Sequence, residues 1–165
     1  WNGLLDKVRE ALFEHCSHDK MLLSHFGRAV MHFSTPLTLF GSLKRPQHGI
    51  DIKKGGIFPI VHGVRTMALE RRIKPTSTLD RLEALVVDGR LDERTAENLG
   101  EALSLFTELR LKQPLQRLEG DQEQAQSPDR VVVQQLSSLE RDLLREALQI
   151  VKEFKQSLAQ RYRFE

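Results

Sequence analysis

The chain has 165 residues, 39% of them hydrophobic, which is enough for one domain built around a real core. Its net charge of +2, without alternating basic and aromatic residues, argues against nucleic-acid binding. The single Cys16 allows no internal disulfide, and we find neither a signal peptide nor an apolar run of membrane-spanning length. We therefore expect a cytoplasmic protein without a membrane partner. Because the chain begins at Trp1 rather than Met, we expect a single domain, residues 1–165, cut from a longer multidomain protein.

Residues 4–33 have apolar residues at helical spacing, which predicts one long helix or two stacked helices broken near residues 17–19. The expected core positions of this segment are Leu5, Val8, Leu12, Cys16, Leu23, Phe26 and Val30. His15 and His18 are close enough to share a metal ion, but no third ligand can be identified, so we predict no metal site. Residues 34–49 contain prolines and glycines and are interpreted as a loop.

The segment 48–85 is the most informative part of the chain. Gly55 and Gly56 permit unusual backbone angles, and Pro59 suits a first helical turn, so a helix is expected to start near Ile57. The spacing of apolar residues predicts one buried stripe, with polar residues opposite. The stripe consists of Ile57, Ile60, Val61, Val64 and Ala68, and the opposite side carries His62, Thr66 and Glu70.

Charged residues around this helix allow two interpretations. Arg65 lies at the edge of the apolar stripe, where a guanidinium needs an anion, and Asp51 could supply one. Lys53 and Lys54 precede the helix N-terminus, where free N–H groups favour an anion. These residues form either an anion-binding pocket, or a structural Arg65–Asp51 ion pair beside two surface lysines.

Three runs of this sequence are similar to a known family: IDIKKGGIFPIVHGVRTMALE, TSTLDRLEAL and EALSLFTELRLKQ. Together they resemble the nucleotidyltransferase substrate-binding domain family. This resemblance implies a position after a nucleotidyltransferase domain in bacterial signal-transduction proteins, which often also carry cyclic-nucleotide-binding and cystathionine-β-synthase (CBS) domains. Arg81, Arg110 and Gln113 stand in the family's recurrent positions.

Two further helices are expected between residues 76 and 113. The first runs from an N-cap at residues 76–78 to about Val87, and the second runs from Asp92 to Gln113, where Pro114 stops it. The apolar stripe of the second continues to Arg110 and Gln113, which lie either at the bundle rim or in a polar cavity.

Residues 115–130 are too polar to pack and are interpreted as a loop. Ser137 and Glu140 form a capping box for a last helix that reaches about Arg163. Its expected buried face is Leu139, Leu143, Ala147, Ile150, Val151, Phe154 and Leu158. The predicted fold is all-α, an antiparallel bundle of five to six helices with a long C-terminal helix.

The leading functional hypothesis is a non-catalytic domain that helps a preceding nucleotidyltransferase domain bind a nucleotide or protein acceptor. The candidate substrate-binding residues are Asp51, Lys53, Lys54, Arg65, Arg81, Arg110 and Gln113. No cofactor is expected in this domain, and Mg²⁺ is expected in the catalytic domain. The competing hypothesis is a regulatory interaction module, or a homodimer formed through the last helix, that touches no substrate.

Overall fold

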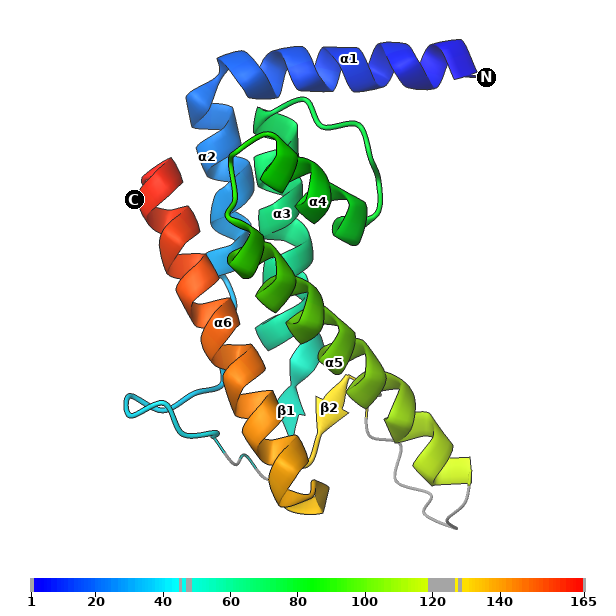
Figure 1. Cartoon of the computed structure of the whole chain (residues 1–165), viewed down its shortest axis with the longest axis vertical. Helices are drawn as coiled ribbons and strands as arrows, with labels where there is room; N and C mark the ends of the chain where they lie inside the picture. The colour runs from blue at the N-terminus through cyan, green and yellow to red at the C-terminus, as the bar shows by residue number, and fades with distance from the viewer. Residues whose placement is uncertain (1, 45, 47–48, 119–126, 128, 165) are drawn as a thin grey trace.

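The computed structural model describes the chain except for residues 1, 45, 47–48, 119–126, 128 and 165, and side chains are not described for Asn2 and residues 113–118. Within these limits the fold is an all-α bundle, as predicted (Figure 1). Its helices are α1 (Asn2–His18), α2 (Lys20–Arg28), α3 (Phe58–Glu70), α4 (Thr78–Val87), α5 (Glu93–Leu118) and α6 (Ser138–Tyr162).

The long helices lie roughly along one axis and alternate in direction. In Figure 1, α2 and α5 run downward, α3 and α6 run upward, α4 packs beside α3, and α1 crosses the top. Shorter pieces connect them: a 3-10 turn η1 (Ala29–Met31), a π-helical turn η2 (Lys53–Ile57) and a 3-10 turn η3 (Val133–Gln135). Strand β1 (Ile50–Asp51) pairs antiparallel with β2 (Arg130–Val131) at the lower end of the bundle.

The first two helices are separated at Asp19, within the region where the break was predicted. Asp19 caps α2, because its Oδ1 accepts the N–H groups of Met21 and Leu22 at 2.9 Å each. The predicted core positions of α1 are wrong at Leu5, Val8 and Leu12, which are 59%, 60% and 49% exposed. α1 crosses the end of the bundle, so its buried residues come from its C-terminal part, Phe13 and Cys16.

Helix α3 is buried on more than one side, because α1, α2, α4 and α6 all contact it. Thr66 was expected on the polar side but is fully buried, and its hydroxyl donates to the His62 carbonyl at 2.9 Å. The His62 ring is half-buried between Phe26 and Phe58, and its Nε2 lies 2.7 Å from the Phe26 carbonyl oxygen. The prediction of a single buried stripe on this helix was therefore too narrow, because helices pack against more than one of its sides.

Helix α5 extends further than predicted. It begins after Asp92, whose Oδ1 accepts the Thr95 N–H at 2.9 Å, but it passes through Pro114 and ends at Leu118. Proline removes one helical hydrogen bond. The loss of that one bond does not end α5, which continues for four residues beyond Pro114. Residues 115–118 are therefore helical, and most of the remaining predicted loop lies outside the described residues.

The long C-terminal helix begins with the predicted capping box. Ser137 Oγ accepts the Glu140 N–H at 3.1 Å, and Glu140 Oε2 accepts the Ser137 N–H at 2.8 Å. The predicted buried face is wrong in the first turns, where Leu139 and Leu143 are 68% and 42% exposed and Leu144 is fully buried. In these turns the neighbouring apolar row, which includes Leu144 and Leu148, faces the core.

Candidate functional site

The clearest candidate pocket lies where residues 32–55 fold back on themselves. It has a volume of about 770 Å³, within the range of small-ligand sites. One wall comes from the segment after η1, and the other comes from β1 and η2. Its lining residues are His32, Phe33, Ser34, Pro36, Thr38, Leu43, Lys44, Pro46, Gly49, Ile50, Asp51, Lys54 and Gly55.

Asp51 and Lys54 are the two predicted site residues in this pocket. Asp51 Oδ1 accepts the Lys54 backbone N–H at 2.9 Å and thus occupies part of the helix N-terminus that we expected to bind an anion. The Lys54 ammonium lies 4.0 Å from Asp51 Oδ2 and 5.6 Å from the centre of the Phe33 ring. Its side chain is 58% exposed, so it is available to a ligand.

The two glycines before α3 are required by close packing and not by unusual backbone angles. Both lie in η2, so Lys53 and Lys54 belong to the first helical turn and do not precede it. A Cβ atom on Gly55 would lie 2.8 Å from Pro36 Cδ, and one on Gly56 would lie 2.7 Å from the Phe106 ring. Gly55 thereby lets the loop that carries Pro36 approach η2 and close the pocket.

Lys53 and Arg110 meet at an acid that the sequence interpretation missed. Asp129 Oδ2 lies 3.7 Å from Lys53 Nζ, and Asp129 Oδ1 lies 2.6 Å from Arg110 Nε. The Asp129 backbone carbonyl accepts the Ile52 N–H at 2.9 Å. These two cations therefore hold the β2 end of the chain against η2 and α5, instead of reaching into the pocket.

Arg65 and Arg81 form a separate group on α3 and α4. The Arg65–Asp51 ion pair, one of the two interpretations of the sequence, is not formed, and in the described part of the chain no acid lies within 4 Å of the Arg65 guanidinium. Arg81 is half-buried, and its Nε donates to the Pro75 carbonyl at 2.8 Å. Burial, together with the positive charge of Arg65, lowers the pKa of Arg81. Two like charges thus lie close together.

Gln113, the remaining predicted residue, has no described side chain.

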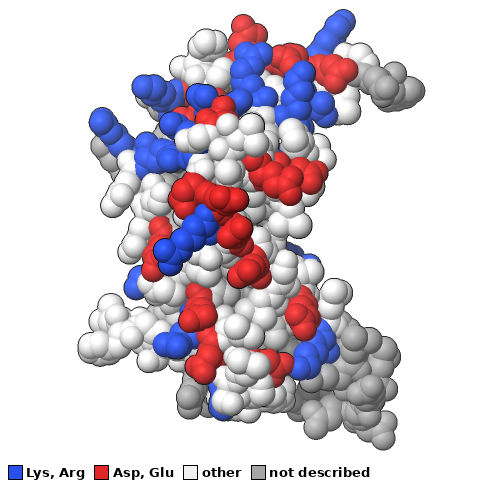
Figure 2. Space-filling model, in the orientation of Figure 1, with Lys and Arg blue, Asp and Glu red and all other residues white. Residues whose placement is uncertain are grey.

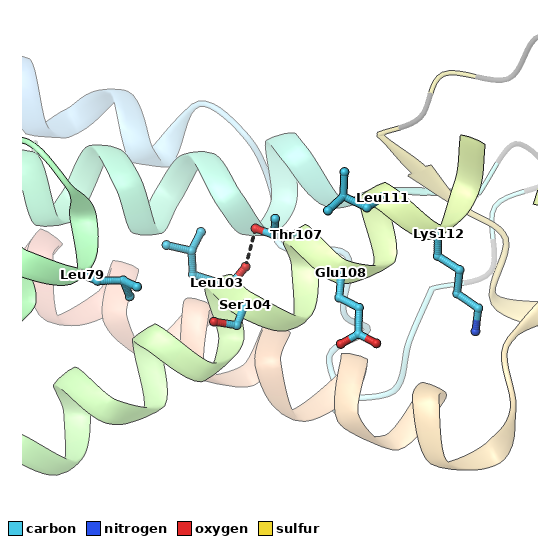
Figure 3. Close-up of a pocket in the computed structure, with 7 residues that line it drawn as sticks. All are labelled: Leu79, Leu103, Ser104, Thr107, Glu108, Leu111 and Lys112. Atoms are coloured by element: carbon cyan, nitrogen blue, oxygen red, sulfur yellow. Dashed lines mark hydrogen bonds between the residues drawn. The ribbon is translucent and has the colours of Figure 1, made fainter. Parts of the chain in front are cut away.

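A second hollow lies between α4 and α5 and is largely apolar (Figure 3). It encloses about 690 Å³. Leu79 comes from α4, and two neighbouring rows of α5 supply the remainder: Leu103, Thr107 and Leu111 in one, and Ser104, Glu108 and Lys112 in the other. Of the predicted site residues whose side chains are described, none lines it.

A buried lysine that sequence reasoning missed supports the main pocket. Lys155 on α6 is only 6% exposed, and its Nζ donates to the Phe33 carbonyl at 2.5 Å. Burial lowers the pKa of this ammonium group. Because Phe33 lines the pocket, Lys155 fixes one pocket wall to the bundle. Lys155 lies one turn after Val151 on the apolar stripe of α6, and this position is the sequence signal from which its burial could have been predicted.

Charges are interspersed over the face shown in Figure 2, where acidic and basic side chains alternate. No group of three or more His, Cys, Asp or Glu side chains suited to a metal ion occurs in the described part of the chain. In that same part, no helix has the length and apolarity needed to cross a membrane.

Comparison with known proteins gives one family. The sequence model described as "Putative nucleotidyltransferase substrate binding domain" matches residues 20–162, which include every candidate site residue. No curated protein and no solved structure matches the chain. The match covers α2 to α6 and most of the sequence, so the chain belongs to the nucleotidyltransferase substrate-binding domain family.

Proposed function

We propose that this domain binds a substrate for a nucleotidyltransferase domain that precedes it in the same polypeptide, without catalysing the transfer itself. Family membership is the observation that carries the proposal. In it, the catalytic domain holds Mg²⁺ and performs nucleotidyl transfer, and this domain positions the nucleotide or protein acceptor. Cyclic-nucleotide-binding or CBS domains of a bacterial signalling protein would control the activity.

The pocket beside η2 is the proposed substrate site. Lys54 and Lys44 place two ammonium groups on its lining, and Phe33 adds an aromatic ring. This combination suits a phosphorylated or carboxylated ligand with a planar group, since ammonium groups neutralise the anion and rings stack. Asp51 orients Lys54 through its backbone N–H and leaves the ammonium group 4.0 Å from the carboxylate.

We assign different roles to the other predicted site residues. Arg65 on α3 and Arg81 on α4 form a second positively charged site, which would bind an anionic part of the substrate or of the catalytic domain. Lys53 and Arg110 share Asp129 and so shape the site without contacting the ligand.

Substitution of Lys54 or Arg65 by Ala in a polypeptide that carries the catalytic domain tests the proposal. Loss of one charged contact to substrate should reduce kcat/KM of transfer about 10-fold or more, because such contacts contribute about 1.5–3 kcal/mol. The melting temperature should stay within about 2 °C, because exposed side chains contribute little to stability. Lys20→Ala, at the exposed start of α2, is the matched control. Unchanged transfer in both variants contradicts the proposal, as does a loss of folding equal to the loss of transfer.

A regulatory interaction module is the competing function. It is favoured by apolar side chains that no part of the described bundle covers, including Leu39 and Phe40 at 96% and 97% exposure. These residues form the tip of a hairpin in which Leu37 pairs with Leu43. In this alternative the hairpin tip contacts a protein partner. The double substitution Leu39→Ser with Phe40→Ser would then abolish regulation of transfer. The separate substitution Lys54→Ala would leave the rate of transfer unchanged.

A further inference from the structure

Helix α1 exposes a continuous apolar face. Leu4, Leu5, Val8 and Leu12 are 63%, 59%, 60% and 49% exposed, although their spacing places them on one side of the helix. The largest contiguous apolar patch of a soluble protein is often functional, so this face is a candidate interaction site. We call these four residues the apolar face of α1.

The direction of this face is fixed by contacts on the rest of the helix. At the C-terminal part, Phe13 and Cys16 are buried in a small cluster with Leu23 and Leu69. On the polar side, Glu10 pairs with the Arg72 guanidinium at 2.6 Å and with the Lys74 ammonium at 3.9 Å. Both kinds of contact hold α1 across the top of the bundle (Figure 1). The four residues of the apolar face remain exposed.

A helix segment with so few neighbours needs a partner. Isolated helices shorter than about 12–15 residues are marginal in water, and most of their stability in proteins comes from packing of the apolar face. Residues 2–12 are helical, yet among those whose side chains are described only Arg9 is even half-buried. α1 also precedes residues 20–162, the part shared with the family. The apolar face of α1 therefore lies outside the part shared with the family and is not covered by the described helices of the bundle.

The size of the face indicates which partner it fits. The exposed parts of its four side chains amount to on the order of 400 Å² per copy, so two copies pairing through it would bury roughly 800 Å², less than the 1,200–2,000 Å² of stable complexes. A covalently linked partner needs less contact area, because the tether supplies an effective concentration of about the millimolar range. The area thus favours a domain of the same polypeptide over a second copy.

We propose that the apolar face of α1 docks on the nucleotidyltransferase domain of the same polypeptide. This inference rests on the proposed function for the identity of the partner. The docking surface on that domain is an apolar groove, and its contact with α1 sets the position of the substrate pocket relative to the catalytic site.

Amide hydrogen exchange tests the docking directly. Amides of residues 4–12 should exchange rapidly in the 165-residue chain and at least 10-fold more slowly in a polypeptide that also contains the catalytic domain. Equal exchange in the two proteins overturns the proposal. Protection in the 165-residue chain that disappears on dilution, with the mass of a dimer in light scattering, also overturns it in favour of a second copy.

Paired variants separate docking from folding. Leu5→Ser combined with Val8→Ser should leave the melting temperature of the 165-residue chain unchanged and remove the protection in the longer polypeptide. Asp6→Ser combined with Glu14→Ser, on the exposed polar side, is the control and should keep the protection. Retained protection in Leu5→Ser with Val8→Ser overturns the proposal.

The outcome is distinguishable from failure of the proposed function. If α1 is protected but transfer is insensitive to Lys54→Ala and Arg65→Ala, the docking stands and only the substrate role fails. If transfer depends on those residues while α1 exchanges freely, the substrate role stands and the docking fails. A reading frame without a nucleotidyltransferase domain ahead of Trp1 overturns both.

Discussion

At the residue scale, Gly56 illustrates how a contact partner can dictate a residue type. The ring of Phe106 fills the space where its Cβ would lie, at 2.7 Å, and Phe106 is itself fully buried. Gly63 repeats the arrangement on α3, where a Cβ would lie 2.5 Å from Leu158 and 2.6 Å from Phe154. Glycines thus bring the helix that carries Lys54 close to α5 and α6.

Replacement of Gly56 by Ala should lower the free energy of unfolding by about 1–3 kcal/mol, because an added methyl group in a packed core forces neighbours apart. Gly100→Ala is the matched control within α5. Its Cβ would meet Leu79 at 3.6 Å, an ordinary contact, so Ala should raise the free energy of unfolding by about 0.5–1 kcal/mol. Urea denaturation measures both. Equal effects of the two substitutions would show that backbone entropy and not the Phe106 contact governs these positions.

Individual functional residues were only partly predictable. The sequence singled out Lys54 and Asp51, which the structure brings together in a pocket. It did not identify Lys155 or Asp129, because each acts on a chain segment far away in sequence, Phe33 and Lys53 respectively. Local patterns hold no information about such partners.

At the scale of elements, the start of α6 combines a capping box with a salt bridge. Glu140 accepts from the Lys112 ammonium of α5 as well as from the Ser137 N–H. The hydrogen bond from Lys112, with those from Ser137, lowers the pKa of Glu140 from 4.5 to about 2. The cap therefore also connects α6 to α5.

Because of this cap, the free energy of unfolding should decrease at acidic pH. Because the folded-state pKa of Glu140 is depressed, its contribution is present above about pH 4.5 and is lost as the pH falls towards 2. We expect the melting temperature to drop less over this interval in Glu140→Gln than in the unmodified chain. Glu146→Gln, on the exposed face of the same helix, serves as control. Parallel pH profiles of all three proteins would contradict the assignment.

Element boundaries followed local chemistry and were predicted well where such chemistry exists. The break at Asp19 and the cap at Ser137 depend on side chains that bond to nearby N–H groups. The end of α5 was predicted wrongly because Pro114 does not stop the helix. The buried side of the first turns of α6 was predicted wrongly because its packing in the bundle, and not local spacing, decides which apolar row is covered. The exposed side of α1 was also predicted wrongly, because α1 crosses the end of the bundle and its N-terminal part does not pack along the other helices.

At the scale of the whole molecule, a partly buried hydrogen-bond network connects three segments that are distant in sequence. The Tyr162 hydroxyl of α6 donates to Glu70 Oε2 of α3 at 2.8 Å, and Glu70 Oε1 pairs with the Arg90 guanidinium at 2.5 Å. The Arg90 carbonyl in turn accepts from Arg161 at 3.2 Å. Burial, together with the nearby Glu70 carboxylate, raises the pKa of Tyr162.

Removal of the Tyr162 hydroxyl should therefore destabilise the whole bundle. Tyr162→Phe is expected to cost about 1–2 kcal/mol, as for hydrogen bonds to a charged acceptor that stays partly buried. The same substitution in a Glu70→Gln background should cost less, because the charged acceptor is already gone. Chemical denaturation of the four proteins provides the cycle. Strictly additive losses would mean that the hydroxyl acts independently of Glu70.

The overall class of fold was predictable, because helical periodicity persists through most of the chain. The β1–β2 pair was not, since each strand has two residues and their partners are remote in sequence. Residues 131–133 are three consecutive valines, a residue type that favours strands, but nothing local indicates that Val131 pairs with Ile50. That pair positions Asp51 in the lining of the pocket.

The β1–β2 pairing also has a consequence for the order of folding. The Arg130 side chain bonds to the Gly49 carbonyl at 3.3 Å, across 81 residues of chain. Closing so large a loop is entropically costly until α3 and α5 have already brought its ends together. We expect the wall of the pocket to form late and to open first, so that the ligand-binding end can loosen while the opposite end stays intact.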